Sequence, residues 1–206
     1  MAAAKTAYAA KGFTAVHDGE LAETAGVSKK TLTEHFPTKD ALYSAMSFDI
    51  PDESHDGQEL HRYISMPAST FKLVLLVHHF IWMLINRPDP VIERLQLRSW
   101  MEDGEFSRVF LNKFFREHWL AQFEACLPAA EESGDLEPTG LSAEYRGWCV
   151  HNLAASFAKH FAAATPSVEY RLPREEVVRS AVVFALRGIG FTHQAIKTHY
   201  NHKSED

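Results

Sequence analysis

The chain has 206 residues and a formal net charge of −6, and 46% of its residues are hydrophobic while 23% are charged. These proportions are typical of a globular protein. They exclude wholesale disorder and a protein that coats nucleic acid through bulk positive charge. The length suits one or two domains.

Cysteine use and hydropathy indicate where the protein works. The two cysteines, Cys126 and Cys149, cannot build a disulfide framework, which predicts a protein of the reducing cytoplasm. The amino-terminal stretch lacks the apolar core of a signal peptide. The most apolar run, residues 73–85, is too short to span a bilayer and contains two histidines. We therefore expect a buried helix there and no membrane association.

The first fifty residues contain short segments separated by turn signals. Gly12, Gly19, Gly26 and Pro37 punctuate this part at spacings that suit helices of two or three turns. The acidic and polar stretch that follows, residues 50–62, predicts a connector.

From about residue 69 onward, long apolar segments have helical periodicity. Prolines mark their expected ends, because proline disfavours helix interiors; these are Pro88, Pro90, Pro128, Pro138, Pro166 and Pro173. The predicted long helices are Ser69–Asn86, the aromatic segment 106–127, Leu141–Ala164 and Arg174–His199. The sequence contains no alternating strand pattern bounded by hairpin turns, so the predicted fold class is all-α.

Residues 19–46 have the pattern of a helix-turn-helix. A short helix over Glu20–Ala25 would turn Leu21 and Ala22 inward, and Gly26 can adopt the left-handed conformation that a tight turn needs. Val27 is expected to plug this turn, and Ser28 to cap the next helix.

The next helix has the features of a recognition helix. Leu32 and Phe36 lie four residues apart and face inward, which leaves polar residues on the outer face: Lys29, Lys30, Thr33 and His35. Pro37 ends this helix and Thr38 caps another, which Leu42, Ala45 and Met46 anchor to the core. The alternative interpretation is an ordinary three-helix subdomain without a DNA partner.

The segment AKGFTAVHDGELAETAGVSKKTLTEHFPTKDALYSAM resembles the DNA-binding head of the tetracycline-repressor (TetR) family of transcriptional regulators. The resemblance covers residues 3–48. It implies a three-helix head, residues 1–50, on a larger helical body, residues 51–206, that binds an effector and dimerises. It also implies a homodimer on a palindromic, double-stranded DNA operator, in which a small ligand bound in the body changes the spacing of the two heads. By matching position, the residues facing DNA would be Lys29, Lys30, Thr31, Thr33 and His35, with Lys39 holding a phosphate.

The head departs from the family pattern at three places. Thr33 stands where the family usually has a phosphate-contacting tyrosine. Asp18 occupies a position that the family packs in the core, and we expect it to cap the second helix instead. The first helix lacks the family's leading turn and its basic residues. These departures keep open a rival hypothesis, in which a TetR-like scaffold has lost DNA binding and acts as a small-molecule carrier or an enzyme.

Aromatic residues on separate helices of the body suggest an effector cavity with a few polar groups, although packing in the core is the simpler explanation for each residue alone. This set favours a hydrophobic or aromatic effector and consists of His78, Trp82, Trp100, Phe110, Phe114 and Trp148. The histidines do not combine into a metal-ligand pattern, because the adjacent pair at positions 78 and 79 diverges on a helix. No catalytic or phosphate-loop motif is present, so we expect neither a cofactor nor an enzyme.

The last two long helices carry more apolar surface than one outer helix of a small body can hide. We therefore expect them to form the dimer contact, as a four-helix interface with twofold symmetry. A small-residue face would allow close approach and consists of Ala154, Ala155, Ala158 and Ala162. Gly188 and Gly190 would serve the same purpose, because glycine inside a helix is otherwise costly.

Overall fold

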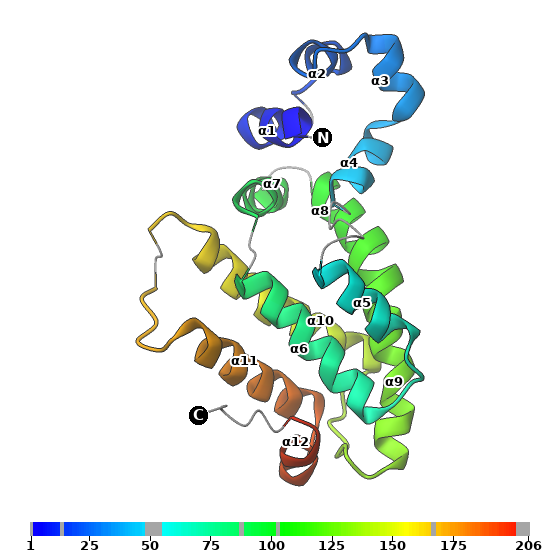
Figure 1. Ribbon diagram of the computed structural model, residues 1–206, viewed down its shortest axis with the longest axis vertical. Coiled ribbons are helices and arrows are strands. Elements are labelled where there is room, and N and C mark those ends of the chain that lie inside the picture. The colour runs from blue at the N-terminus through cyan, green and yellow to red at the C-terminus, as the bar shows by residue number, and fades with distance from the viewer. Residues whose placement is uncertain are drawn as a thin grey trace. The chain divides into compact units, whose positions relative to one another are not determined.

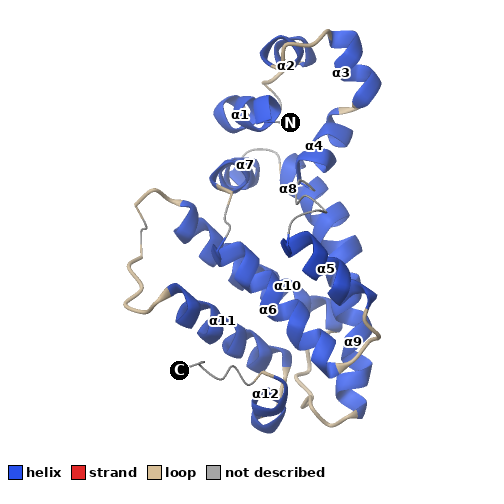
Figure 2. Ribbon diagram, in the orientation of Figure 1, coloured by secondary structure: helices blue, strands red, loops and turns tan. Residues whose placement is uncertain are grey.

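The computed structural model describes residues 2–12, 15–47, 55–86, 89–101, 104–165 and 168–200. Within these ranges the chain is helical, apart from turns and one isolated bridge between Leu136 and Phe191, as Figures 1 and 2 show. The all-α prediction is confirmed. The chain forms two compact units, a first unit of residues 1–51 and 89–118 and a second unit of residues 52–88 and 119–206.

The first unit contains the helices of the predicted amino-terminal head and two helices from beyond residue 89. Its helices are α1 (Ala2–Lys11), α2 (Asp18–Thr24), α3 (Lys29–His35), α4 (Lys39–Ser47), α7 (Pro90–Met101) and α8 (Glu105–Val109). Its core joins residues from both parts of the chain, because Leu95 and Phe106 pack in one cluster with Tyr8, Leu21 and Met46. The hydrophobic core of the amino-terminal head is therefore completed by helices from beyond residue 89.

The second unit is built around one apolar helix. Its helices are α5 (His55–Ser65), α6 (Thr70–Asn86), α9 (Ala121–Glu132), α10 (Ala143–Ala162), α11 (Arg174–Ile189) and α12 (His193–His199). Figure 1 shows α6 running beside α10 and α11, and it also packs against α9. Leu73, Val77 and Ile81 of α6 are fully buried. This confirms the predicted central helix, as α10 confirms the helix predicted over Leu141–Ala164.

The aromatic segment is helical throughout, as predicted, but its geometry changes along the way. Between α8 and α9, the chain forms a π-helix, η1 (Phe110–Leu120), which the sequence pattern did not predict. Of the aromatic and aliphatic residues spaced at helical intervals, Phe106, Trp119, Phe123 and Leu127 are buried and Phe110 is only half-buried. Phe115, which does not belong to this pattern, is fully buried within η1. Helical periodicity therefore located part of the buried face and did not predict the change in hydrogen-bonding pattern.

Residues 50–62 are not a connector, because α5 begins at His55. The prediction failed because the stretch is mostly polar. The segment nevertheless carries Leu60, Tyr63 and Ile64 on one helix face. Tyr63 is buried there, and the other two residues are half-buried. Residues 50–54 lie outside the described residues.

Pro128 does not end a helix, because it lies inside α9. Phe123, Cys126, Leu127 and Ala130 are all buried on either side of it. Burial of this face outweighs the cost of about 3 kcal/mol that proline imposes on a helix interior. Pro90 and Pro173 do mark helix starts, while Pro88 and Pro166 lie outside the described residues.

The single helix predicted over Arg174–His199 is broken in two. Gly190 caps α11 with a φ of 112°, and α12 begins three residues later. A Cβ atom at Gly190 would lie 2.6 Å from the carbonyl oxygen of Glu137. The close backbone approach that we expected between two protomers at Gly190 therefore occurs within one chain.

The small-residue face of α10 also serves the chain's own core. Ala154, Ala155 and Ala158 are buried in the second unit, where α10 packs against α6 and α11. The prediction that these alanines form the dimer contact is wrong, because the chain's own helices already cover them. Gly188 remains exposed, with open space where a Cβ atom would point.

Candidate functional site

The turn between α2 and α3 has the predicted geometry. Gly26 adopts a φ of 68°, and the next backbone N–H, that of Val27, donates to the carbonyl of Ala22 at 2.9 Å. The hydroxyl of Ser28 accepts a hydrogen bond from the backbone N–H of Thr31 at 3.0 Å, which caps α3. Val27 does not plug the turn, because it is 40% exposed, whereas Leu21 and Ala22 of α2 are buried.

Helix α3 presents a polar face. Leu32 and Phe36 are half-buried and pack against the core of the first unit. Lys29, Lys30, Thr33 and His35 are exposed, and Thr31 is half-buried with its hydroxyl 2.8 Å from that of Ser28. The fold thus brings the predicted DNA-facing residues of this helix to one solvent-accessible region.

Two side chains on this face are held by their own helix. The hydroxyl of Thr33 donates to the carbonyl of Lys29 at 2.9 Å. The Nδ1 atom of His35 lies 3.0 Å from the carbonyl of Thr31, and because a carbonyl can only accept, this nitrogen carries the proton. The Nε2 atom of neutral His35 is therefore a hydrogen-bond acceptor.

Lys30 has a neighbouring carboxylate on the same helix. Its Nζ atom lies 3.8 Å from Oε1 of Glu34, and both side chains are mostly exposed. Exposed pairs of this kind are weak, so a phosphate or a base edge can compete for the lysine.

Helix α4 begins four residues after α3 ends. The hydroxyl of Thr38 accepts from the backbone N–H of Ala41 at 3.1 Å, which confirms the predicted cap. Leu42 and Met46 are buried and anchor the helix to the core. Lys39, its first residue, is half-buried at the position where the family resemblance expects a phosphate contact.

Asp18 does not cap α2. The N-cap residue is His17, which makes no side-chain cap bond, and Asp18 is the first residue of the helix. Together with Glu20 it places negative charge in the first turn, where the helix dipole favours it. Burial, and secondarily the charge of Asp18, raise the pKa of Tyr8 well above its usual range.

The predicted effector residues are divided between the units. Trp100, which is 42% exposed, and half-buried Phe110 belong to the first unit, whereas His78, Trp82 and Trp148 belong to the second. The side chain of Phe114 lies outside the described residues.

Within the second unit these residues have partners of their own. Nδ1 of His78 lies 3.1 Å from the hydroxyl of Tyr200, and the ring of Trp82 stacks on that of His79. Trp148 donates from Nε1 to Glu144 at 3.3 Å. These residues therefore make contacts within the protein, as core residues do. Their role in binding an effector remains a prediction.

An aromatic cluster that was not predicted as a unit joins α6, η1, α9 and α10. The rings of Phe80 and Trp119 lie 4.8 Å apart and those of Trp119 and Phe123 lie 5.0 Å apart. His151 lies 6.1 Å from Phe80 and 5.7 Å from Trp148. Burial lowers the pKa of His151 to about 4, so this histidine is neutral at pH 7. The spacing of Trp119 and Phe123 predicted that they share one buried helix face, but it did not predict which residues of other helices they contact.

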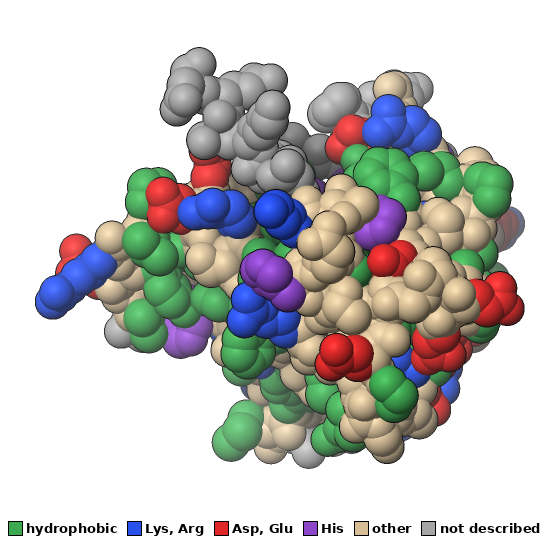
Figure 3. All heavy atoms as spheres, turned by 90° about the horizontal axis from the view of Figure 1, so that it is seen from below, with side chains coloured by type: hydrophobic (Ala, Val, Ile, Leu, Met, Phe, Trp, Pro, Cys, Tyr) green, Lys and Arg blue, Asp and Glu red, His purple; other side chains and the backbone are tan. Residues whose placement is uncertain are grey.

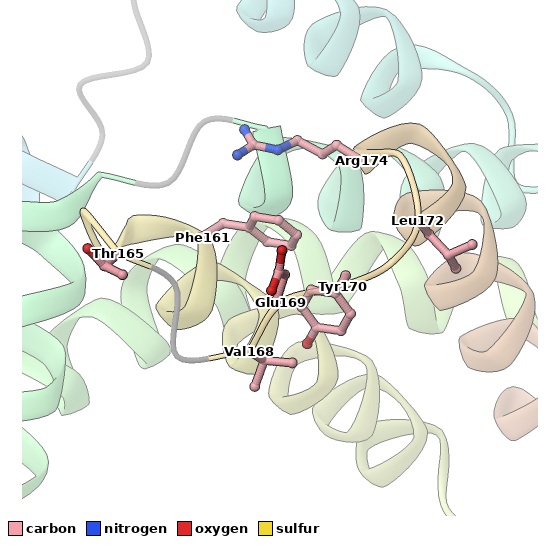
Figure 4. Close-up of a pocket in the computed structure, with 7 residues that line it drawn as sticks. All are labelled: Phe161, Thr165, Val168, Glu169, Tyr170, Leu172 and Arg174. Carbon is pink, nitrogen blue, oxygen red and sulfur yellow. The ribbon is translucent and has the colours of Figure 1, made fainter.

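A pocket of about 470 Å³ lies at the connection between α10 and α11 (Figure 4), and none of the predicted effector residues lines it. Its lining consists of Phe161, Thr165, Val168, Glu169, Tyr170, Leu172 and Arg174. The part of the chain that the structure describes contains no group of three or more histidine, cysteine or carboxylate side chains placed to hold a metal ion. None of its described helices is long and apolar enough to cross a membrane.

The fold and the face of α3 define a helix-turn-helix protein with a helical body. Residues 1–46 match the family model of bacterial regulatory proteins of the tetR family, which confirms the predicted resemblance of the amino-terminal head to this family. No curated protein sequence matches the chain significantly.

Three solved structures show that the fold occurs in other proteins. Bacillus subtilis FadR in complex with stearoyl-CoA is 18% identical, with a TM-score of 0.61 over 91% of this chain and 96% of that one. A TetR family transcriptional regulator from Pseudomonas syringae pv. tomato is 22% identical, with a TM-score of 0.57 over 90% and 92% of the two chains. RolR in complex with resorcinol is 14% identical, with a TM-score of 0.56 over 100% and 92%. At these identities the similarity establishes the fold.

Proposed function

We propose that the protein is a ligand-responsive transcriptional repressor of the cytoplasm that binds a palindromic operator as a homodimer. In this proposal residues 1–50 contact DNA, and residues 51–206 bind the effector and dimerise.

The exposed polar face of α3 carries this proposal. Two lysines, Lys29 and Lys30, open a helix whose opposite side packs into the core, which suits a helix that enters a major groove. Lys39 is the first residue of α4, whose start is capped by Thr38, and it would hold a backbone phosphate. On the face that Figure 3 shows, acidic, basic and hydrophobic side chains are interspersed, so the focused charge of α3 is the better candidate for binding DNA.

The dimer contact is proposed on the outer faces of α10 and α11. Phe184 on α11 is 69% exposed and Tyr145 on α10 is 57% exposed, which is unusual for large apolar side chains on packed helices. Gly188 lies one turn after Phe184 and leaves room for a second backbone. A twofold contact across these helices would cover all three residues.

The effector is proposed to be a hydrophobic or aromatic small molecule. The structures of FadR and RolR, which have this fold, are complexes with stearoyl-CoA and resorcinol, so the fold accommodates ligands of these kinds. The candidate contact residues remain His78, Trp82, Trp100, Phe110, Phe114 and Trp148.

An electrophoretic mobility shift with the DNA upstream of the protein's own gene tests the proposal. The wild-type protein should shift this fragment in the presence of excess nonspecific DNA. The double variant Lys29→Ala, Lys30→Ala should lose the shift, whereas Lys197→Ala, which removes an exposed lysine of α12, should retain it. Equal retention by both variants would contradict a role for α3.

The carrier or enzyme hypothesis rests on Thr33. Its one hydroxyl hydrogen is donated to Lys29, so the residue cannot donate to a phosphate while that bond persists. A wild-type protein that binds its own upstream DNA no better than random DNA, yet binds a small molecule, would favour this second function.

A further inference from the structure

The exposed face of α10 carries no charge. Four residues of this helix are exposed, and all four are uncharged: Tyr145, Cys149, Asn152 and Ser156. At about 100° per residue they lie within an arc of about 60°, so they form one stripe along the helix. Charged residues dominate surfaces that face water, whereas they are depleted at the centre of protein interfaces. The stripe therefore has the composition of a covered surface.

Helix α11, which packs beside α10, exposes a stripe with opposite charges at its two ends. The stripe consists of Glu176, Ser180, Val183, Phe184 and Arg187, of which Val183 is half-buried and the others are exposed. These residues lie within an arc of about 100°, and the other exposed charges of α11 lie outside this arc. Among the residues that the structure describes, neither Glu176 nor Arg187 has an ion-pair partner within 4.0 Å.

The helix dipole by itself favours this placement of charge. An acidic residue is stabilised in the first turn of a helix and a basic residue in the last, which is where Glu176 and Arg187 lie. The dipole explains neither the uncharged stripe on α10 nor the exposed ring of Phe184 between the two charges. A contact with a second copy of the chain explains all three features.

A twofold axis can relate two copies of α11 in two ways. If the helices run parallel, Glu176 meets Glu176 of the partner subunit and Arg187 meets Arg187 of the partner subunit, so both ends repel. If they run antiparallel about an axis midway along the stripe, Glu176 lies opposite Arg187 of the partner subunit at both ends. The uncharged residues of the stripe then meet one another at the centre.

The length of the stripe permits both pairs to form together. Positions 176 and 187 are about 16 Å apart along the helix, so each pair lies about 8 Å from the axis. Helices that cross at a shallow angle are still close to each other at this distance from the axis, within reach of two long side chains.

We propose that two copies associate through antiparallel α11 helices, with Glu176 of each copy paired with Arg187 of the partner subunit. The inference rests on the dimer contact of the proposed function and adds the orientation of its helices and the residues that select the partner. A chain of the same fold without these opposite charges would leave them unpaired or repel them, so the pairs favour association of the chain with itself.

Charge reversals in the full chain test this proposal by sedimentation equilibrium at about 50 mM salt, where screening is weak. Glu176→Arg and Arg187→Glu each replace two attractive pairs by two like-charge pairs, so each should raise the dissociation constant of the dimer at least about tenfold. If net charge alone mattered, the two variants would have opposite effects, because one makes the negative chain less negative and the other makes it more negative. The double variant should return to within about threefold of the wild type.

An equimolar mixture of the two single variants is a stricter test. Each variant alone has like charges at both ends of the contact, but a heterodimer of Glu176→Arg with Arg187→Glu regains two opposite-charge pairs. The mixture should therefore contain dimers at concentrations where each variant alone is a monomer. A mixture that sediments as its separate components do would overturn the pairing.

Glu175→Arg is the matched control, because it reverses an exposed charge in the same first turn of α11 but outside the stripe. It weakens the dipole interaction as Glu176→Arg does, and it should leave the dissociation constant unchanged. A wild-type monomer would remove the dimer contact of the proposed function together with this inference. A wild-type dimer that tolerates both single reversals, or that responds equally to reversal at 175 and 176, would overturn the antiparallel pairing alone.

Discussion

The Nε2 atom of His199 lies 3.3 Å from Oδ2 of Asp135, so the last described helix is tied to the loop that follows α9. The same oxygen accepts hydrogen bonds from the hydroxyls of Thr70, at 2.8 Å, and Ser133, at 2.7 Å. The backbone of this loop also pairs with the chain around Gly190, through the N–H of Glu137. One carboxylate therefore joins the start of α6, the end of α9 and the end of α12.

This network predicts a pH-dependent stability. Burial by itself would raise the pKa of Asp135, but the hydrogen bonds from Ser133 and Thr70 and the charge of His199 together lower it. A lowered pKa means that the folded state binds fewer protons than the unfolded state, so the contribution of Asp135 is complete above about pH 5 and is lost as the pH falls below about 4.

The variant Asp135→Asn should lower the free energy of unfolding at pH 7 by about 1–3 kcal/mol, because its neutral amide oxygen is a weaker acceptor than a carboxylate and its NH₂ group cannot accept at all. The difference between wild type and variant should shrink between about pH 5 and pH 3, as measured by urea unfolding. Glu132→Gln, at an exposed position near the same helix end, should leave stability and its pH dependence unchanged. A constant difference across this range would contradict the assigned ionisation.

Two glycines with left-handed backbones differ in their surroundings, so replacing each by alanine should lower the stability of the fold by a different amount. Gly190 has a φ of 112° and the backbone of Glu137 occupies the space of a Cβ atom, whereas Gly134 has a φ of 73° and open space there. Gly134→Ala should cost about 1 kcal/mol from backbone strain alone. Gly190→Ala should cost about 3 kcal/mol or more, because neither backbone segment can move without breaking its hydrogen bonds. Thermal unfolding at one fixed protein concentration measures both, and equal losses would refute the close approach.

The proposed dimer contact predicts a specific effect of charge at position 184. Phe184→Glu should convert the dimer to a monomer at micromolar concentration, because a carboxylate at the centre of an apolar twofold contact meets its own copy. Phe71→Glu is the matched control, since Phe71 is 48% exposed on α6, outside the two helices of the contact. Sedimentation velocity distinguishes the two variants. A wild-type protein that sediments as a monomer would remove the proposed contact altogether.

Local signals were enough to predict the helix-turn-helix. Gly26 and Ser28 determine their turn and cap through bonds to residues at most five positions away, so their roles can be inferred from neighbours in the sequence. The break at Gly190 could not be predicted, because its cause is the backbone of Glu137, more than fifty residues earlier. Helix α5 was missed for a related reason: only one narrow face of a polar stretch is buried, and its partners lie on other helices.

The candidate ligand sites were harder to predict from the sequence than the helices. The aromatic side chains were visible in the sequence, but their partners depend on how the helices pack. Phe80 meets Trp119 from a different helix, whereas Trp148 donates to Glu144 of its own helix. The pocket beside Tyr170 combines two helix ends with an irregular connection, for which periodicity gives no prediction.

The hydrogen bond from the Thr33 hydroxyl to the Lys29 carbonyl leads to a prediction about DNA affinity. A hydroxyl that donates to its own helix has no second hydrogen for a phosphate, and a tyrosine at this position would extend its hydroxyl beyond the helix backbone. If α3 binds DNA, Thr33→Tyr should raise affinity about tenfold without changing the preferred sequence, because the added contact is to the DNA backbone. The salt dependence of binding should change little, since tyrosine adds no positive charge. Thr24→Tyr is the control, because the Thr24 hydroxyl makes the same type of bond, to Glu20 at 2.8 Å, on α2. Fluorescence anisotropy with the upstream DNA measures both variants, and an equal change in the two would show that position 33 makes no particular contact with DNA.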